Sequence, residues 1–309
     1  MFDTPVILFC FNRPTTVQTV FAQIARLKPK KLYLVADGPR KNHPDDIILC
    51  AQVQNIILAI DWECQISTLF FEDNQGCRKA FLQGLNWIFT QENHAIILED
   101  DCVPDLTFFT FCQELLDLYE DQPQIMSIAG FRYLPDNINS AKSYCFSKYT
   151  QSWGWATWKR AWSLMDAELT TWDDLQQASW LDTYLLNQDY STYWRHIFNK
   201  MKNGMDTWDY AWIYSCWKNS GLTIHPNVNL ISPIGFGLNA THNRDEAHPA
   251  AFRKTIPMAF PLRHPGEIIL QNHFEEWVEE HYFSGMNKRR IHLGFSRILT
   301  KRRQMTKRD

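Results

Sequence analysis

Residues 96–101 read IILEDD, and this short stretch indicates both a fold and a site. The apolar run over residues 95–98 is typical of a strand covered on both faces of a sheet. Glu99, Asp100 and Asp101 follow it directly. Three carboxylates in that position are unfavourable unless a cation or a bound polar ligand compensates them. The stretch therefore predicts a buried strand that ends in a charged binding site.

A divalent metal would relieve the mutual repulsion of these acids. Hard oxygen ligands suit Mg²⁺ or Mn²⁺, which keep several waters and bridge to substrate phosphates. We therefore expect a metal-diphosphate role for the cluster. The alternative is that the acids cap a helix beginning near Asp105.

The residues before this stretch alternate between strand and helix patterns. This alternation predicts an α/β fold with a mostly parallel sheet flanked by helices, whose ligands sit at the carboxyl ends of the strands. The informative residues therefore follow each apolar run. The predicted strands are residues 6–11, 32–36, 66–71 and 95–98, and the predicted helices are residues 14–27, 45–60 and 77–89.

Composition excludes several classes of protein. The 309 residues are 45% hydrophobic, which is enough for a buried core. Neither G-x-G-x-x-G nor G-x-x-x-x-G-K-[ST] occurs, which argues against a dinucleotide-binding Rossmann unit and a P-loop enzyme. No apolar run approaches the ~18–20 residues of a membrane span, and the first residues lack the basic start of a signal peptide. The eight scattered cysteines, without a C-x-x-C pair, favour reduced thiols in a cytoplasmic protein.

Four motifs together resemble a known family. They are FNRP at residues 11–14, ADGPR at 36–40, LEDD at 98–101 and WGWATW at 153–158. The combination resembles the GT-A nucleotide-diphospho-sugar glycosyltransferases, most closely a bacterial family 2-like group with some members labelled hemolysin-like. The likeness spans roughly residues 5–245. It implies a Rossmann-like GT-A fold with a nucleotide-sugar-binding half (residues 1–130) and an aromatic-rich acceptor half (131–245), followed by a packing segment (246–287) and a basic tail (288–309).

The resemblance also implies roles for the acids. GT-A enzymes use a metal-binding D-x-D-type motif, and the Glu-Asp-Asp form is similar to that of the N-acetylglucosaminyltransferase I relatives. Asp101 would then be the direct metal ligand, with Glu99 or Asp100 near the ribose and diphosphate. His242 is similar to the C-terminal metal-binding histidine of the family. A lone histidine is otherwise more often structural, and nothing is assigned to His225 or His248.

The other nucleotide-side candidates each have a simpler alternative. Asp37 ends the second predicted strand, where a carboxylate can accept the N–H of a uracil base, but it also fits an Asp-Gly turn. Asn12 and Arg13 follow the first strand, and the Arg13 guanidinium can reach a diphosphate or form a surface ion pair. Arg78 begins a helix beside Lys79 and could steer the nucleotide, although helix-surface charges are usually solvated.

The aromatic half supplies the acceptor-side candidates. Ten of the 13 tryptophans lie between Trp153 and Trp217. Trp153, Gly154 and Trp155 resemble the glycine-containing loop beside the donor sugar and acceptor. Flat indoles can stack on sugar faces, and glycine permits a close backbone approach. Trp155, Trp158 and Trp162 have helical spacing, which favours a core role for the last two.

One carboxylate is expected to act as the catalytic base, because an inverting sugar transfer must remove the proton of the acceptor hydroxyl. Asp209 occupies the place of the family's base downstream of the glycine loop. Asp206 is the rival, and either acid could instead cap the following helix.

The charge is unevenly distributed along the chain. Residues 288–309 hold nine basic residues and one acidic residue, a net of +8, whereas the rest holds 22 basic and 33 acidic residues, a net of −11. The tail suits a peripheral contact with an anionic membrane on its cytoplasmic face, or is simply solvated. Nucleic acid is not the expected partner, because residues 1–287 carry a net charge of −11.

The sequence therefore predicts a metal-dependent, inverting glycosyltransferase with Mn²⁺ or Mg²⁺. The expected donor is a nucleotide sugar, with UDP as the nucleotide, and the expected acceptor is a glycan or lipid-linked glycan of polysaccharide biosynthesis. A metal-dependent nucleotidyltransferase is one alternative, but residues 11–14 lack its glycine-rich loop, and the D-x-D-x-[TV] motif of a haloacid-type phosphatase is also absent. The other is a non-catalytic glycan-binding protein with a degenerate donor site.

Overall fold

The computed structural model describes residues 2–136, 138, 140–185, 187–237, 248 and 250–284. Its strands are β1 (Val6–Cys10), β2 (Lys31–Ala36), β3 (Gln65–Phe70), β4 (His94–Glu99), β5 (Cys102–Pro104), β6 (Ile125–Ala129), β7 (Tyr144–Ser147), β8 (Trp155–Trp158), β9 (Leu222–Pro226) and β10 (Ile231–Pro233). Its helices are α1 (Pro14–Leu27), α2 (Asp45–Leu58), α3 (Cys77–Ile88), α4 (Leu106–Leu118), α5 (Lys159–Trp162), α6 (Trp172–Gln177), α7 (Trp180–Tyr184), α8 (Gln188–Lys202), α9 (Asp209–Lys218), α10 (Asn272–Val278) and the π-helix η1 (Glu279–Ser284).

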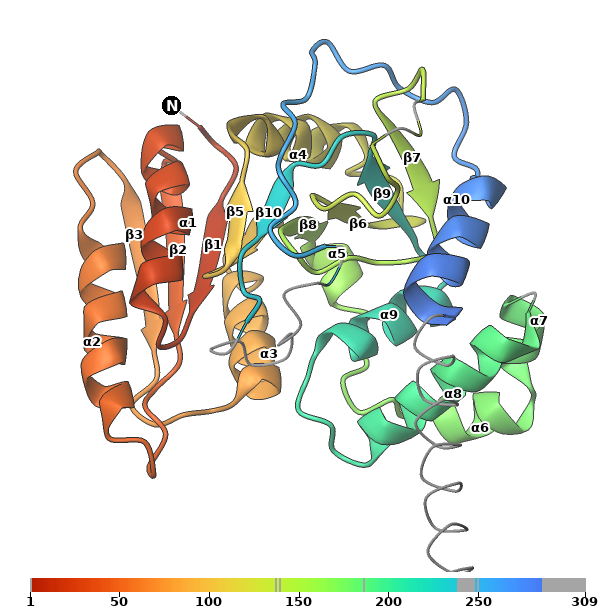
Figure 1. Ribbon diagram of the computed structural model, residues 1–309, viewed down its shortest axis with the longest axis horizontal. Helices are drawn as coiled ribbons and strands as arrows, with labels where there is room; N and C mark the ends of the chain where they lie inside the picture. The colour runs from red at the N-terminus through yellow and green to blue at the C-terminus, as the bar shows by residue number, and fades with distance from the viewer. Residues whose placement is uncertain are drawn as a thin grey trace, which may run out of the picture.

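A single eight-stranded sheet runs through both halves of the chain, in the order β3-β2-β1-β4-β8-β6-β9-β7. Neighbouring strands are parallel from β3 to β4 and between β6 and β9, whereas β8 and β7 run antiparallel to their neighbours. The predicted fold class is confirmed: an α/β architecture with a mostly parallel sheet flanked by helices, which fits a Rossmann-like GT-A fold. Figure 1 shows β1–β3 on one side of the molecule and α6–α9 on the other.

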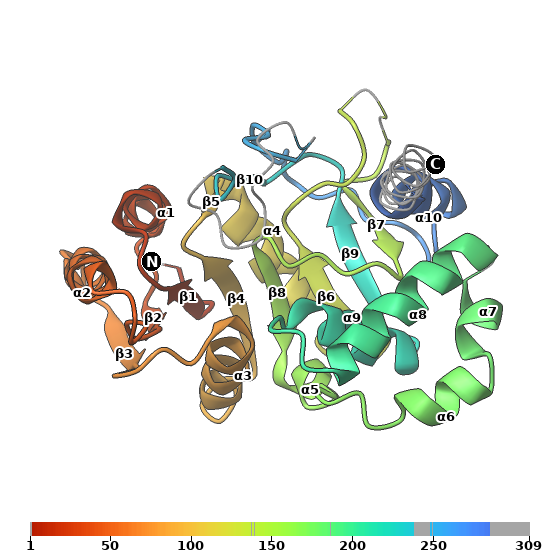
Figure 2. The same ribbon diagram turned by 60° about the horizontal axis from the view of Figure 1, so that its bottom comes forward.

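Helices cover both faces of the sheet, as the continuous apolar runs of the strands require. Alternate residues of β1, such as Val6 and Leu8, pack in one core with the buried faces of α1, α2 and α4. Ile7 and Phe9, between them, face a second core that includes residues of α3, α5 and α9. Figure 2 shows α1 and α2 on one face of β1–β3 and α3 on the other.

The strand order reverses at β1, although β2, β1 and β4 all run in the same direction. The chain passes from β1 to β2 on one side, whereas β4 pairs with β1 on the other side. Such a switch point leaves a crevice at the carboxyl ends of the two strands. Phe9 lies beside Glu99 in the β1–β4 register, so the segments that follow both strands leave the sheet at the same edge.

The tryptophan-rich segment differs from the helical spacing noted in the sequence. Residues Trp155–Trp158 form strand β8, and only Lys159–Trp162 form a helix, α5. Every residue of this strand is buried, because β8 lies between β4 and β6 in the centre of the sheet. Burial on both faces removes the alternation that normally marks a strand, so the spacing misled the prediction.

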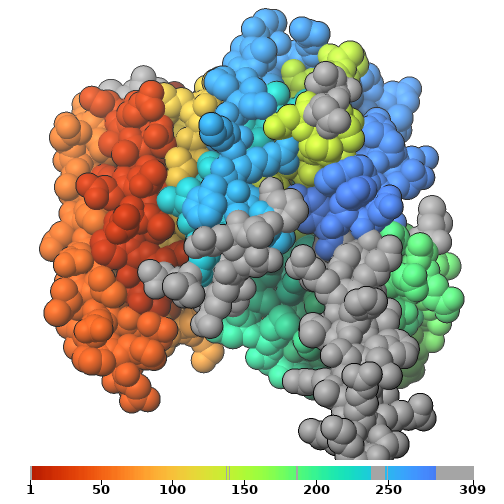
Figure 3. Space-filling view, in the orientation of Figure 1, coloured from red at the N-terminus to blue at the C-terminus, as the bar shows by residue number. Residues whose placement is uncertain are grey.

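The segment after residue 250 has little regular structure until α10. It is tied to the body through backbone donors, which include Met258 to Thr107 Oγ1 at 2.8 Å and Ile256 to the Asn229 carbonyl at 2.7 Å. In Figure 3 this segment (blue) is spread over the molecular surface. None of the helices within the described ranges is both long and apolar enough to cross a membrane.

Buried charges fasten α10 and η1 to the end of β7. Lys148 Nζ lies 2.9 Å from Glu279 Oε1 and 3.7 Å from Glu275 Oε2. The Tyr149 hydroxyl donates to Glu279 Oε1 at 2.8 Å. Burial raises the pKa of Glu275 to about 7, although Ser147 and Lys148 act in the opposite direction.

This raised pKa predicts a pH-dependent stability. A folded state that holds the Glu275 proton more tightly than the unfolded state loses stability as the pH rises from 4.5 to about 7. Glu275→Gln should remove that loss, which amounts to at most about 3 kcal/mol. Urea unfolding between pH 4 and 8 measures it, with the exposed neighbour Glu276→Gln as the control. Equal pH slopes in wild type and Glu275→Gln would contradict the prediction.

Candidate functional site

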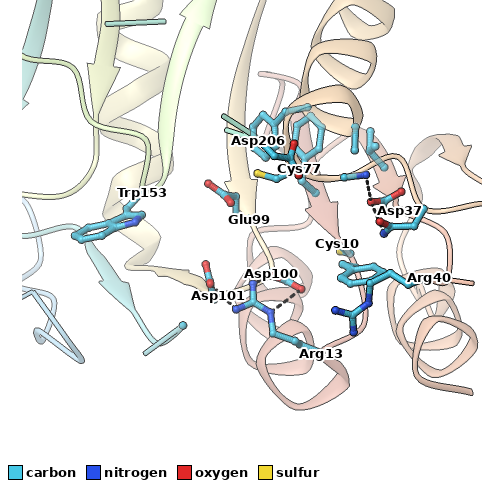
Figure 4. A pocket seen from close by; sticks show the side chains of 18 residues that line it. Cys10, Arg13, Asp37, Arg40, Cys77, Glu99, Asp100, Asp101, Trp153 and Asp206 are labelled. Atoms are coloured by element: carbon cyan, nitrogen blue, oxygen red, sulfur yellow. Dashed lines mark hydrogen bonds and ion pairs between the residues drawn. The ribbon is translucent and has the colours of Figure 1, made fainter. Parts of the chain in front are cut away.

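A cavity of about 360 Å³ lies at the carboxyl ends of β1, β2 and β4. Figure 4 shows the acid cluster at its centre, with Trp153 on one side and Asp37 and Arg40 on the other. Its volume is in the range of small-molecule sites. The lining residues are Phe9, Cys10, Phe11, Arg13, Val35, Asp37, Arg40, Asn74, Gly76, Cys77, Ala80, Phe81, Glu99, Asp100, Asp101, Trp153, Asp206 and Gly235.

The three predicted acids lie together in this cavity, and Arg13 joins two of them. The Arg13 guanidinium forms an ion pair with Asp100 and places Nη1 2.8 Å from Asp101 Oδ2. Its Nε also donates to Asp100 Oδ2 at 3.4 Å. The acids do not cap a helix: the strand β5 follows them, and Asp105 itself caps α4 by accepting from the Thr107 amide at 2.9 Å.

The electrostatics of the cluster are unbalanced. Among the described residues, Glu99 has no ion-pair partner, although Arg13 is close enough to act on it at longer range. Burial, with the charges of Asp101 and Asp100, holds the pKa of Glu99 well above its ordinary value. Burial also raises the pKa of Asp100, but the adjacent Arg13 opposes that shift. The single positive charge of Arg13 therefore compensates only part of the negative charge of the three carboxylates.

The small sheet of β5 and β10 brings a distant segment against Asp101. Pro233 pairs with Cys102, and the Ile234 amide donates to the Asp101 carbonyl at 2.8 Å. A Cβ atom on Gly235 would collide with the Asp101 carboxylate, so only glycine permits this approach. The segment that leads toward His242 thus starts beside the predicted metal ligand, while His242 itself lies outside the described residues.

The donor set fits a hard divalent cation only in part. Mg²⁺ and Mn²⁺ are commonly held by one or two carboxylates with waters and substrate phosphates, and Asp101 and Glu99 both line the cavity. In the part of the chain that the structure describes, no group of three or more His, Cys, Asp or Glu side chains could by itself hold a metal. The residues present therefore suit a cation that phosphate oxygens help to bind.

Asp37 is buried, and its carboxylate already accepts four hydrogen bonds. Its Oδ1 accepts from the amides of Gly38 at 2.9 Å and Gln75 at 2.7 Å. Its Oδ2 accepts from Asn74 Nδ2 at 2.8 Å and the Gly76 amide at 3.2 Å. A carboxylate has about four acceptor positions, so none remains for a base N–H. The structure supports the turn alternative: Asp37 organises residues 74–76.

Arg40, a basic residue, and Asn12, a neutral amide, lie apart from the three acids that follow β4. Arg40 forms an ion pair with Asp46 at 2.6 Å, and Asn12 Nδ2 donates to the other oxygen of Asp46 at 2.7 Å. Arg40 also lies over the Phe11 ring and lines the cavity, whereas Asn12 does not. Arg40 has no predicted role from the sequence, and its position after the Asp37-Gly38 turn is the signal that could have identified it.

Arg78 does not line the cavity. Its guanidinium, which is 16% exposed, donates to Glu168 Oε1 at 2.8 Å and to the Ala167 carbonyl, so it is paired with another segment of the chain and is not a solvated surface charge. The Arg78 amide donates to Asp206 Oδ1 at 3.0 Å. Asp206 thereby caps α3 from 128 residues away, which no local sequence pattern could have indicated.

The two candidate bases occupy different positions. Asp206 lines the cavity beside Gly76 and Cys77. Asp209 is the first residue of α9 and accepts from the Thr207 hydroxyl and from the Tyr210 amide at 2.9 Å. The Asp209 charge helps to raise the pKa of Glu99, so it lies within electrostatic range of the acid cluster.

The tryptophan loop divides into a cavity residue and a core residue. Trp153 lines the cavity, and its ring packs edge-on against Phe131 at a centroid distance of 4.9 Å. Gly154 adopts a φ of +62°, and a Cβ there would collide with Ile231. Trp155 is fully buried and stacks on Trp208 at 5.3 Å. The expectation that the Trp155 indole contacts a sugar is therefore corrected: in this structure it forms part of the core.

This division predicts losses of stability of different size for two substitutions. Trp155→Ala should lower the free energy of unfolding by about 3–5 kcal/mol, because it empties a buried indole site. Trp153→Ala should cost less than half as much. Urea unfolding measures both, with the half-buried Trp87→Ala as a further control. A loss below about 1 kcal/mol for Trp155→Ala would contradict the core assignment.

No protein-family model matches this chain, and no curated protein matches it. Among solved structures, a UDP-glucose pyrophosphorylase complexed with UDP-glucose is 12% identical, with a TM-score of 0.28 over 48% of this chain and 64% of that one. The chain therefore spans less than two thirds of that pyrophosphorylase.

Two other solved structures match part of the chain at similarly low identity. A 4-diphosphocytidyl-2C-methyl-D-erythritol synthase from Anaerococcus prevotii DSM 20548 is 11% identical, with a TM-score of 0.30 over 55% of this chain and 77% of that one. The galactosyltransferase LgtC, in complex with donor and acceptor sugar analogues, is 7% identical, with a TM-score of 0.38 over 71% and 73%. The family resemblance stays a prediction, and the site's own geometry carries the functional proposal.

Proposed function

We propose that this protein is a metal-dependent glycosyltransferase that moves a sugar from a nucleoside diphosphate, UDP in the first instance, to a glycan hydroxyl. The observation that carries the proposal is the cavity at the switch point, where three carboxylates lie together and the Arg13 guanidinium pairs with only two of them. A cluster with an excess of negative charge favours the binding of a cation. The bound cation would in turn attract a diphosphate.

In this proposal, different residues along the cavity bind the diphosphate, the nucleoside and the sugar of the donor. Asp101, with Glu99 beside it, would hold Mn²⁺ or Mg²⁺ together with diphosphate oxygens; His242 stays a predicted further ligand. When bound, the cation supplies positive charge to the leaving diphosphate. The nucleoside would lie toward Phe11, Arg40 and the loop that Asp37 organises. The sugar would then lie toward Trp153.

The transfer itself needs a base near the acceptor. In the proposed inverting reaction the acceptor oxygen bonds to the anomeric carbon while the bond from that carbon to the diphosphate breaks. The acceptor proton passes to Asp209, and the nucleoside diphosphate leaves. Asp209 is preferred because the family resemblance gives it the place of the base. Asp206 is the rival: it lines the cavity, which Asp209 does not, but it also caps α3 through the Arg78 amide.

Asp209→Asn should lower the transfer rate by about 10²–10⁴-fold, because it removes the proton acceptor and leaves the cavity intact. UDP binding in the presence of Mn²⁺ should change less than threefold. Asp206→Asn is the matched control and should retain at least a tenth of the activity. The assay is release of nucleoside diphosphate from a panel of nucleotide sugars. An active Asp209→Asn with an inactive Asp206→Asn would assign the base to Asp206 instead.

Calorimetry with UDP and Mn²⁺ tests the donor site independently of the acceptor. We expect binding that depends on both components. Glycan binding without any nucleotide binding would contradict the proposed function and favour a non-catalytic glycan-binding protein. Incorporation of a nucleoside monophosphate into a sugar phosphate would favour a nucleotidyltransferase.

A further inference from the structure

Arg13 links the two segments that leave the sheet at the β1–β4 edge. It follows β1, while Asp100 and Asp101 follow β4. The guanidinium contacts Asp100 through Nη2 and Nε and contacts Asp101 through Nη1. A planar fork with several donors is suited to bridging two carboxylates in this way.

The two halves of this bridge differ in exposure. The Asp100 side chain is 4% exposed and has two contacts to Arg13. The Asp101 side chain is 18% exposed and has one contact, at 2.8 Å. The contact to Asp101 is therefore the one that solvent and ligands can reach, and a single partly exposed ion pair is the weaker of the two.

Asp101 has little room for two cations at once. Arg13 Nη1 contacts its Oδ2, and the Gly235 backbone packs so closely against the same oxygen that even a Cβ atom would collide with it. A divalent cation on Oδ2 would lie a few ångströms from the guanidinium, where like charges repel strongly. The other oxygen, Oδ1, accepts from Cys102 Sγ at 3.4 Å, so the cation and Arg13 are alternative partners of Oδ2.

We propose that Arg13 is the resident counter-ion of Asp101, which a divalent cation displaces, and that the displaced guanidinium edge turns to the nucleotide diphosphate. Arg13 keeps its buried contacts to Asp100 during this exchange. This inference rests on the proposed function, because it assumes that the cation and a diphosphate bind here.

The exchange couples the two ligands. Without nucleotide, cation binding must break the Arg13–Asp101 ion pair and leave Nη1 without an acceptor. With nucleotide, the diphosphate supplies that acceptor. Nucleotide therefore raises the affinity for the cation, and by linkage the cation raises the affinity for nucleotide by the same factor.

The experiment measures Mn²⁺ binding to the full-length chain, by the loss of the free-Mn²⁺ electron paramagnetic resonance signal, with and without UDP. Arg13→Gln frees Asp101 but leaves Asp100 buried without a partner, which endangers folding. The double variant Arg13→Gln/Asp100→Asn removes both charges. It keeps the formal charge of the wild-type cluster while freeing Asp101, so a changed affinity reports the vacated oxygen and not the net charge.

Without UDP, the double variant should bind Mn²⁺ at least tenfold more tightly than the wild type. UDP should tighten Mn²⁺ binding at least tenfold in the wild type and less than threefold in the double variant. Arg195→Gln, which breaks an exposed ion pair with Asp182 on α7, is the control and should behave as the wild type.

Equal or weaker Mn²⁺ binding by the double variant without UDP would overturn the exchange. An undiminished effect of UDP in that variant would also overturn it. If the exchange is observed but no nucleotide sugar is turned over by the wild type, the proposed function fails while the inference stands. Sugar transfer by a wild type that already binds Mn²⁺ tightly without UDP would reject the exchange alone.

Discussion

The parallel pairing of β1 with β4 is the constraint on which the rest of the site depends. Its register sets Phe9 beside Glu99, so the chain leaves both strands at the same level and Arg13 meets Asp100 and Asp101. A shift of the register by one residue would turn alternate side chains to the opposite face of the sheet. Both faces are buried here, which makes such a shift costly and holds the charged residues in place.

Strand β8, from the second half of the chain, packs beside β4 and stabilises the position of the β1–β4 pair. The buried strand β8 pairs with β4, and its Trp155 stacks on Trp208, which in turn stacks on Phe81 of α3 at 4.3 Å. Trp208 directly precedes α9, which begins at Asp209. The aromatic core thus links the position of the candidate base to the helix that walls the cavity. Large rings in contact have few alternative packings, so they hold these elements in a defined relation.

The sequence was sufficient to predict what depends on local patterns. Continuous apolar runs located β1, β2 and β4, and the acids after β4 marked the site. Contacts between distant residues could not be predicted in the same way. Asp206 caps α3, and Arg78 pairs with Glu168 some 90 residues away. Asp37 was recognised as a site residue, but only the fold of residues 74–76 shows that its acceptor positions are filled. The resemblance of residues 153–155 to a glycine-containing loop predicts substrate contact for Trp155, and only the pairing of β8 with β4 and β6 shows that its indole is in the core.

The two ends of the cavity use carboxylates in opposite ways. Asp37 accepts one hydrogen bond from Gly38 and three from residues 74–76 in the loop after β3, so its carboxylate stabilises the fold of that loop. Of the three acids after β4, Asp100 and Asp101 pair with the Arg13 guanidinium. Glu99 has no ion-pair partner among the described residues. Burial makes an uncompensated charge unfavourable, whereas a satisfied one is tolerated. A carboxylate therefore stabilises the fold at one end, and under the proposed function the carboxylates at the other end bind the ligand. The difference follows from how many donors the surrounding backbone provides.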